Sequence, residues 1–174
     1  MIISAFFAAM SIVLGKYLAI NLGDTLRFSF ENLPVILAGV AFGPVYGALV
    51  GIVADLIGCL LVGYAINPVI TLGAATIGMI SGLYRYFPER AGGVSRFLYI
   101  ALAVFSSHAV GSVIIKTVGL AKFYDMPLGI LMLWRLLNYL IIAILETVII
   151  SFILSSKSIT QELNKIDPKG RWHG

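Results

Sequence analysis

The chain has 174 residues, of which 60% are hydrophobic and only 11% are charged, and its formal net charge is +4. Soluble domains carry about 25% charged residues, so this composition excludes a water-soluble globule, and it is the opposite of a disordered composition. The apolar residues form continuous runs of roughly 20, the length of a membrane-crossing helix. Barrel strands would alternate apolar and polar residues instead. The composition therefore predicts an all-α, polytopic membrane protein.

In chain order, the apolar runs predict six membrane-spanning helices. One apolar stretch is divided at Pro44, because proline cannot continue a helix, whereas Pro68 suits the first turn of the next helix. The predicted helices cover roughly residues 2–20, 33–42, 45–63, 68–86, 97–117 and 128–155. Residues 1–156 are thus expected to form a membrane domain, followed by a polar cytoplasmic tail at 157–174.

The basic residues predict the orientation. Six spans put both termini on one side, and the break at 85–96 lies on that side too. Seven basic residues gather there: Arg85, Arg90, Arg96, Lys157, Lys165, Lys169 and Arg171. By the positive-inside tendency both termini are cytoplasmic, and the breaks at 21–32, 64–67 and 118–127 face outward.

A row of small residues marks the packed face of the third predicted helix. Gly43, Gly47 and Gly51 recur every four residues, and Asp55 and Cys59 continue the row. Residues four apart share a helix face, and small residues let another helix approach closely. Asp55 therefore faces protein, either as a structural carboxylate or as a ligand contact.

The last two predicted helices carry polar stripes. Arg135, Asn138 and Glu146 lie on one face of the sixth helix, with the first two in the outer half. His108 and Lys116 share a face of the fifth helix. Ionisable residues inside a membrane normally face protein or a cavity, and His108 is either a hydrogen-bonded structural residue or a ligand contact.

The outward breaks add further polar and aromatic side chains. They contribute Arg27, Phe28, Glu31, Asn32, Tyr64 and Asn67. Polar groups thus gather in the outer half of the bundle, whereas the inner half has few besides Glu146. This asymmetry predicts a binding pocket that opens outside, not a channel.

The first predicted helix carries small residues one turn apart, Ala5 and Ala9. Such spacing serves either internal packing or the docking of another membrane subunit.

Several kinds of chemistry have no motif in this chain. There is no G-x-x-x-x-G-K-[ST] phosphate loop, no G-x-S-x-G elbow and no H-E-x-x-H pair. The lone Cys59 cannot form an internal disulfide, and no cofactor or metal site is expected. The basic residues lie at helix ends, which gives no reason to expect nucleic acid as a partner. We therefore predict a protein that binds a small molecule without catalysing a reaction.

Five segments carry a more specific signal: LGDTLRFSFENLP at 22–34, FGP at 42–44, GALVG at 47–51, ADLIG at 54–58 and GYAINP at 63–68. Over roughly residues 2–155 the chain resembles the substrate-binding subunits (S-components) of energy-coupling factor (ECF) vitamin importers. Within these, LRFSFENLP at 26–34 and GYAINP at 63–68 point to the folate-specific members.

The resemblance implies a six-helix, multi-pass subunit of a bacterial cell membrane. Such a subunit binds one vitamin from outside and works with a transmembrane coupling protein and two ATPase subunits, which hydrolyse the ATP. In this family an A-x-x-x-A pattern docks the coupling protein, and the pattern falls here on Ala5 and Ala9.

The chemistry of folate suggests a role for each candidate. Parallel N–H donors of a pterin ring suit a carboxylate, Asp55 or Glu31. Amide and hydroxyl groups could complete the contacts with the ring edge: Asn32, Asn67, Thr71 and Asn138. Aromatic side chains could stack on its face: Phe28, Tyr64 or Tyr139. The anionic glutamate tail could meet Arg27, Arg135 or Lys122, although Arg27 could instead pin the outer loop to Glu31.

Three rival functions stay open at this point. The chain could take another vitamin, such as thiamin, riboflavin or a pterin precursor. It could be an intramembrane enzyme that uses His108 with a serine, or a carrier coupled to an ion gradient.

Overall fold

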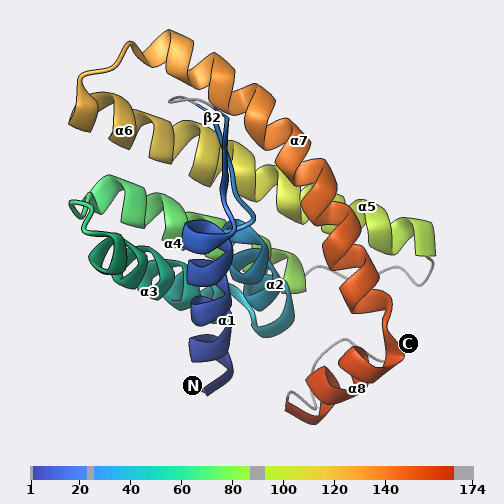
Figure 1. Cartoon of the computed structure of the whole chain (residues 1–174). Helices are drawn as coiled ribbons and strands as arrows, with labels where there is room; N and C mark the ends of the chain where they lie inside the picture. Colours follow the sequence, from blue (N-terminus) through green and yellow to red (C-terminus); the bar gives the residue numbers. More distant parts are fainter. Residues whose placement is uncertain (1, 23–25, 87–92, 167–174) are drawn as a thin grey trace.

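The computed structural model describes residues 2–22, 26–86 and 93–166, and within this part the chain is a helical bundle with one small hairpin (Figure 1). The first half comprises α1 (Ile2–Ile12), the π-helical turn η1 (Val13–Tyr17), β1 (Ile20–Leu22), β2 (Leu26–Phe28), α2 (Asn32–Phe42), α3 (Pro44–Val62), α4 (Pro68–Leu83) and the 3₁₀ turn η2 (Tyr84–Tyr86). The second half comprises α5 (Gly93–Ser107), the π-helical η3 (His108–Ile115), α6 (Lys116–Tyr124), α7 (Leu128–Ser155) and α8 (Lys157–Ile166).

Helices occupy each of the six predicted ranges, and the breaks have local causes. Gly43 adopts a φ of 97° between α2 and α3, a conformation that glycine tolerates, and Pro44 then starts α3. Gly63 ends α3 at a φ of 73°. The side chain of Asn67 accepts a hydrogen bond of 2.9 Å from the Val69 N–H, which caps α4.

The structure differs from the prediction at several points; the fifth helix, for example, begins at Gly93 and not near residue 97. The first helix ends at Tyr17, not near residue 20, because Ile20 already pairs with Phe28 in the antiparallel hairpin. The fifth helix runs on past residue 117 to Tyr124 and ends at Asp125, whose φ is 50°. Within the predicted polar tail, Lys157–Ile166 forms the helix α8.

Three helices in the described ranges are long and apolar enough to cross a membrane: Pro44–Val62, Val94–Tyr124 and Leu128–Ser155. The helices Ile2–Tyr17 and Asn32–Phe42 are apolar but shorter. Some of the basic residues that predict orientation (Arg90, Lys169 and Arg171) lie outside the described residues.

The predicted glycine row packs against α4. A Cβ atom at Gly47 would lie 2.3 Å from the Gly78 carbonyl oxygen, and one at Gly51 would lie 2.3 Å from that of Ala74. The row therefore lets the α3 and α4 backbones touch, as its spacing predicts. Figure 1 shows α1 to α4 gathered together, with the rod from α5 to α6 and helix α7 alongside them.

Candidate functional site

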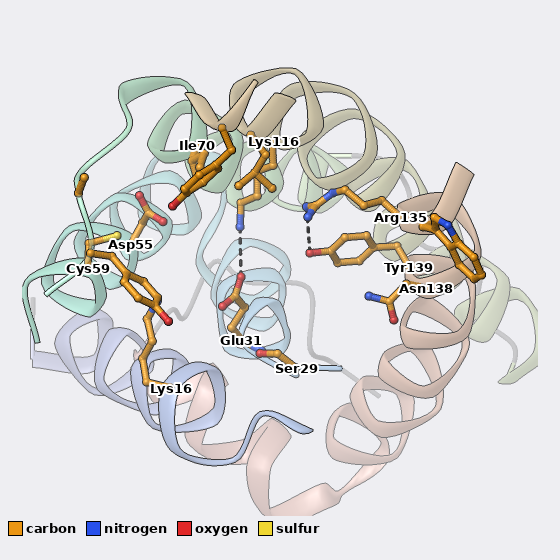
Figure 2. A pocket seen from close by; sticks show the side chains of 15 residues that line it. Lys16, Ser29, Glu31, Asp55, Cys59, Ile70, Lys116, Arg135, Asn138 and Tyr139 are labelled. Atoms are coloured by element: carbon orange, nitrogen blue, oxygen red, sulfur yellow. Dashed lines mark hydrogen bonds and ion pairs between the residues drawn. The ribbon is translucent and has the colours of Figure 1, made fainter. Parts of the chain in front are cut away.

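A cavity of about 270 Å³ lies between the two halves of the chain, and Figure 2 looks into it. Its walls come from η1, the β2–α2 link, α3, the start of α4, α6 and α7. The lining residues are Lys16, Ser29, Glu31, Asp55, Cys59, Tyr64, Ala65, Ile70, Lys116, Leu120, Tyr124, Trp134, Arg135, Asn138 and Tyr139. Among these described residues three side chains are basic and two are acidic, so the cavity suits a ligand with both donor groups and negative charge.

Glu31 and Lys116 meet inside this cavity. Lys116 Nζ lies 3.4 Å from Glu31 Oε1, and Lys116 is only 5% exposed (Figure 2). The Glu31 backbone is held on both sides, because its N–H donates to Ser29 Oγ at 3.1 Å and its carbonyl accepts from Ser11 Oγ at 2.5 Å. A Cβ atom at Gly15 would lie 2.8 Å from Glu31 Cβ, so a glycine there makes room for this carboxylate.

Asp55 is held by α4. Thr71 Oγ1 donates a hydrogen bond of 2.6 Å to Asp55 Oδ2. Among the residues that the structure describes, Thr71 is the one that hydrogen-bonds to this carboxylate. The Asp55 side chain also lines the cavity. On the same side of the cavity, Lys16 Nζ lies 5.5 Å from the centre of the Tyr64 ring, a cation–π distance.

Helix α7 supplies the opposite wall with Arg135, Asn138 and Tyr139 (Figure 2). Arg135 Nη2 donates to the Ser112 carbonyl at 3.1 Å and to Tyr139 Oη at 3.4 Å. Its guanidinium carbon lies 5.1 Å from the centre of the Tyr139 ring. The arginine is thus tied to η3 and to the aromatic ring next to it.

His108 lies behind this wall and does not line the cavity. Its Nε2 is 2.6 Å from Glu146 Oε2, its Nδ1 is 3.1 Å from Ser112 Oγ, and its ring stacks on Tyr139 at 5.1 Å with an interplanar angle of 28°. This Ser–His–Glu series has the connectivity of a nucleophile, a base and an acid. However, Ser112 is fully buried and lines neither of the cavities described here.

Six of the predicted site residues line the cavity: Glu31, Asp55, Tyr64, Arg135, Asn138 and Tyr139. Asn32 lies beside it, in the wall of an adjoining cavity of about 30 Å³ that also touches Asp55, Glu31, Lys16 and Lys116.

The other predicted residues lie elsewhere, for physical reasons. Asn67 caps α4 with one side-chain atom and donates to the Gly119 carbonyl at 3.1 Å with the other, which occupies both ends of its amide. Thr71 contacts Asp55 and not the cavity. Phe28 lies in β2 and is not a lining residue. Arg27 is also in β2, but its side chain lies outside the described part of the structure.

Several lining residues were not predicted as contacts. Lys16 and Lys116 are charges within apolar runs, a signal that could have identified both. Cys59 shares the helix face of Asp55, a position from which a contact could have been predicted. Ser29 and Trp134 carry no local signal, because a serine in a loop and an aromatic residue on an apolar helix are ordinary. Among the described residues no group of three or more His, Cys, Asp or Glu side chains could hold a metal ion.

Comparison with known proteins gives three results. The sequence model of the family described as "ECF transporter, substrate-specific component" matches residues 1–156. The folate transporter FolT of Clostridium novyi (strain NT) is 32% identical over 87 residues, which cover 49% of this chain and 50% of that protein. The aligned region thus spans about half the length of this curated relative. A crystal structure of FolT bound with folic acid superposes with a TM-score of 0.69 at 25% identity, covering 86% of this chain and 88% of the other.

Proposed function

Because this chain belongs to the substrate-specific components of ECF transporters, we propose that it captures folate and delivers it across the membrane with partner subunits. One observation carries the proposal. A single cavity gathers two carboxylates, three basic side chains and aromatic rings from both halves of the chain. The likeness to FolT in sequence and in fold supports folate as the vitamin.

The two carboxylates suit the pterin end of folate. The pterin ring presents an amino group beside a ring N–H, and one carboxylate accepts both hydrogen bonds side by side. Asp55 is the better placed of the two, because Thr71 occupies one oxygen and orients the group. Glu31 contacts Lys116, and it accepts hydrogen bonds from the edge of the pterin ring if the ligand displaces that contact. Asn138 adds an amide to the same lining.

The basic residues suit the other end of the molecule. The glutamate tail of folate is anionic, and a guanidinium group binds a carboxylate with two parallel hydrogen bonds. Arg135 is positioned for this role by Ser112 and Tyr139. Lys16 lies across the cavity and adds a second positive charge (Figure 2).

For the membrane arrangement we propose six crossings with both termini and α8 in the cytoplasm. Six lining residues lie in the chain breaks predicted to face outward, and this supports a cavity that opens outside: Ser29, Glu31, Tyr64, Ala65, Leu120 and Tyr124. The basic residues Arg85, Arg96 and Lys157 belong to the breaks at the other end, as the positive-inside tendency requires.

For transport the chain needs partners that supply energy. We propose a transmembrane coupling protein that docks on α1 at Ala5 and Ala9, together with two ATPase subunits. Both alanines are exposed on the helix surface, which leaves their face open to another helix.

Two measurements test the proposed function. Purified protein in detergent should bind folate at micromolar levels or tighter, and folate should outcompete thiamin and riboflavin in a competition series. Vesicles that contain this subunit alone should not accumulate folate, whereas vesicles that also contain the coupling protein and the ATPases should do so when ATP is present. Absence of folate binding refutes the vitamin assignment, and uptake by the subunit alone supports an ion-coupled carrier instead.

A further inference from the structure

His108 and Glu146 form a buried pair for which the proposed function has no use. His108 is 2% exposed and Glu146 is 0% exposed, and neither lines the cavity. An ionisable pair this deep in a membrane bundle is costly to desolvate, so its position calls for a physical explanation. The explanation lies in the residues that the imidazole ring contacts between Glu146 and the cavity.

Both ring nitrogens of His108 are engaged. Nε2 contacts Glu146 on α7 at 2.6 Å, and Nδ1 contacts the hydroxyl of Ser112, one turn further along the chain, at 3.1 Å. A rotation of the imidazole about its Cβ–Cγ bond would break both contacts at once. The ring plane is therefore fixed by two hydrogen bonds between residues that are all buried.

This fixed plane is the surface on which Tyr139 lies. The two rings stack at 5.1 Å, and the Tyr139 ring forms part of the cavity wall. Arg135 links Ser112 to Tyr139, because its guanidinium group contacts the Tyr139 hydroxyl and ring as well as the Ser112 carbonyl. The contacts thus run from His108 through Ser112 and Arg135 to Tyr139 and back to His108, with Glu146 as the anchor.

We propose that the His108–Glu146 pair is a positioning element of the binding site. It holds the Tyr139 ring in one orientation. Through Tyr139 it also fixes the position of Arg135, the cationic residue beside that ring in the cavity wall. Its effect on ligand affinity rests on the proposed function, whereas its effect on Tyr139 does not.

The first test needs no ligand. The protein is labelled with 3-fluorotyrosine, and the Tyr139 signal in the ¹⁹F NMR spectrum is assigned from the Tyr139→Phe variant. Glu146→Leu removes the anchor and should shift and broaden the Tyr139 signal. Glu146→Gln keeps an acceptor for the imidazole N–H and should leave the signal in place. Thr147→Val is the matched control, because the neighbouring Thr147 hydroxyl contacts only the Ala143 carbonyl of its own helix among the described residues.

The second test is a double-mutant cycle on folate affinity. His108→Gln keeps a donor for Glu146 but removes the ring that supports Tyr139. It should weaken folate binding about 3- to 10-fold, the range expected for a stacked aromatic pair. In a Tyr139→Leu background the same substitution should change the affinity less than 2-fold, because the residue through which His108 acts is gone.

The outcomes separate this inference from the proposed function. An unchanged Tyr139 signal in Glu146→Leu overturns the inference, and so does an equal loss of affinity from His108→Gln in both backgrounds. If the unmodified protein does not bind folate, the proposed function fails, and the ¹⁹F experiment alone decides the role of the pair.

Discussion

Lys116 Nζ lies 3.4 Å from Glu31 Oε1, although the two residues are 85 positions apart in the chain. Lys116 stands at the start of α6, and Glu31 directly precedes α2. Their contact joins the two halves of the bundle inside the cavity that we propose for folate. A ligand that enters the cavity competes with Lys116 for Glu31, or with Glu31 for Lys116.

The Lys116–Glu31 contact leads to the first prediction. Lys116→Met should weaken folate binding by roughly 1–3 kcal/mol, because it removes one of the three basic side chains that line the cavity and attract an anionic ligand. Isothermal titration calorimetry on the purified protein measures the change. Lys122→Met is the control, because Lys122 is an exposed lysine on the same helix and is not a lining residue. Equal affinities of Lys116→Met and the unmodified protein would contradict a role for Lys116 in binding.

The second prediction concerns the carboxylate held by Thr71. Asp55→Asn keeps the shape of the side chain but removes its charge, and it should weaken folate binding by roughly 1–3 kcal/mol. Thr71→Val removes the orienting hydrogen bond, and its effect should be about 0.5–1.5 kcal/mol. Glu162→Gln on α8, where the carboxylate is exposed, serves as control and should have no effect. If Asp55→Asn and Glu31→Gln both bind folate with unchanged affinity, neither carboxylate accepts the hydrogen bonds of the pterin ring.

The third prediction concerns stability. His108→Leu leaves Glu146 buried without its partner, and such a loss typically costs about 3–5 kcal/mol. The double variant His108→Leu/Glu146→Leu removes both polar groups and should be closer to the unmodified protein in the free energy of unfolding. Unfolding in a denaturing detergent, followed by circular dichroism, provides the comparison. If the double variant is at least as unstable as His108→Leu, the prediction is wrong. The pair would then stabilise the protein by more than satisfying each other's buried polar groups.

The fourth prediction concerns the contact between α3 and α4. A Cβ atom at Gly78 would lie 2.0 Å from the Gly47 carbonyl oxygen, so Gly78→Ala should push the two backbones apart and destabilise the protein by about 1–3 kcal/mol. Gly129→Ala is the matched control, because a Cβ there meets nothing within 4 Å beyond its chain neighbours and its own helix backbone, and alanine favours a helix over glycine. Thermal unfolding of the two variants should therefore shift in opposite directions.

The fifth prediction separates binding from transport. Ala5→Trp or Ala9→Trp should leave folate affinity unchanged, because neither alanine lines the cavity, but should block uptake in vesicles with the partner subunits. Phe6→Trp places the same side chain between them on α1 and should retain uptake. A loss of folate binding in the alanine variants would indicate that their face packs within this subunit.

The local features of the fold were predictable, because each depends on residues that are close together in the chain. Apolar runs, the helix break at Pro44 and the glycine row that ends at Asp55 all follow from spacing. The exceptions were boundaries. The hairpin that starts at Ile20 depends on pairing with Phe28, and this pairing leaves little trace in the apolar pattern.

The site was predictable only in part. An ionisable residue in an apolar run must face protein, and this argument correctly singled out Asp55, Arg135 and His108 as inward-facing residues. It could not separate a residue that lines a cavity from one that lies behind the lining. His108 is of the second kind, since Tyr139 stands between it and the space that Arg135 enters.

The sequence by itself thus determined that this protein is a bundle of membrane helices and which face of the third, fifth and sixth helices carries polar groups, since these properties repeat along a single helix axis. Only the tertiary structure decided which polar groups meet. Glu146 pairs with His108 and Glu31 with Lys116 because packing sets the rotation and height of each helix against its neighbours. The rotation and height of each helix depend on contacts across the whole bundle, so they cannot be inferred from any single stretch of sequence.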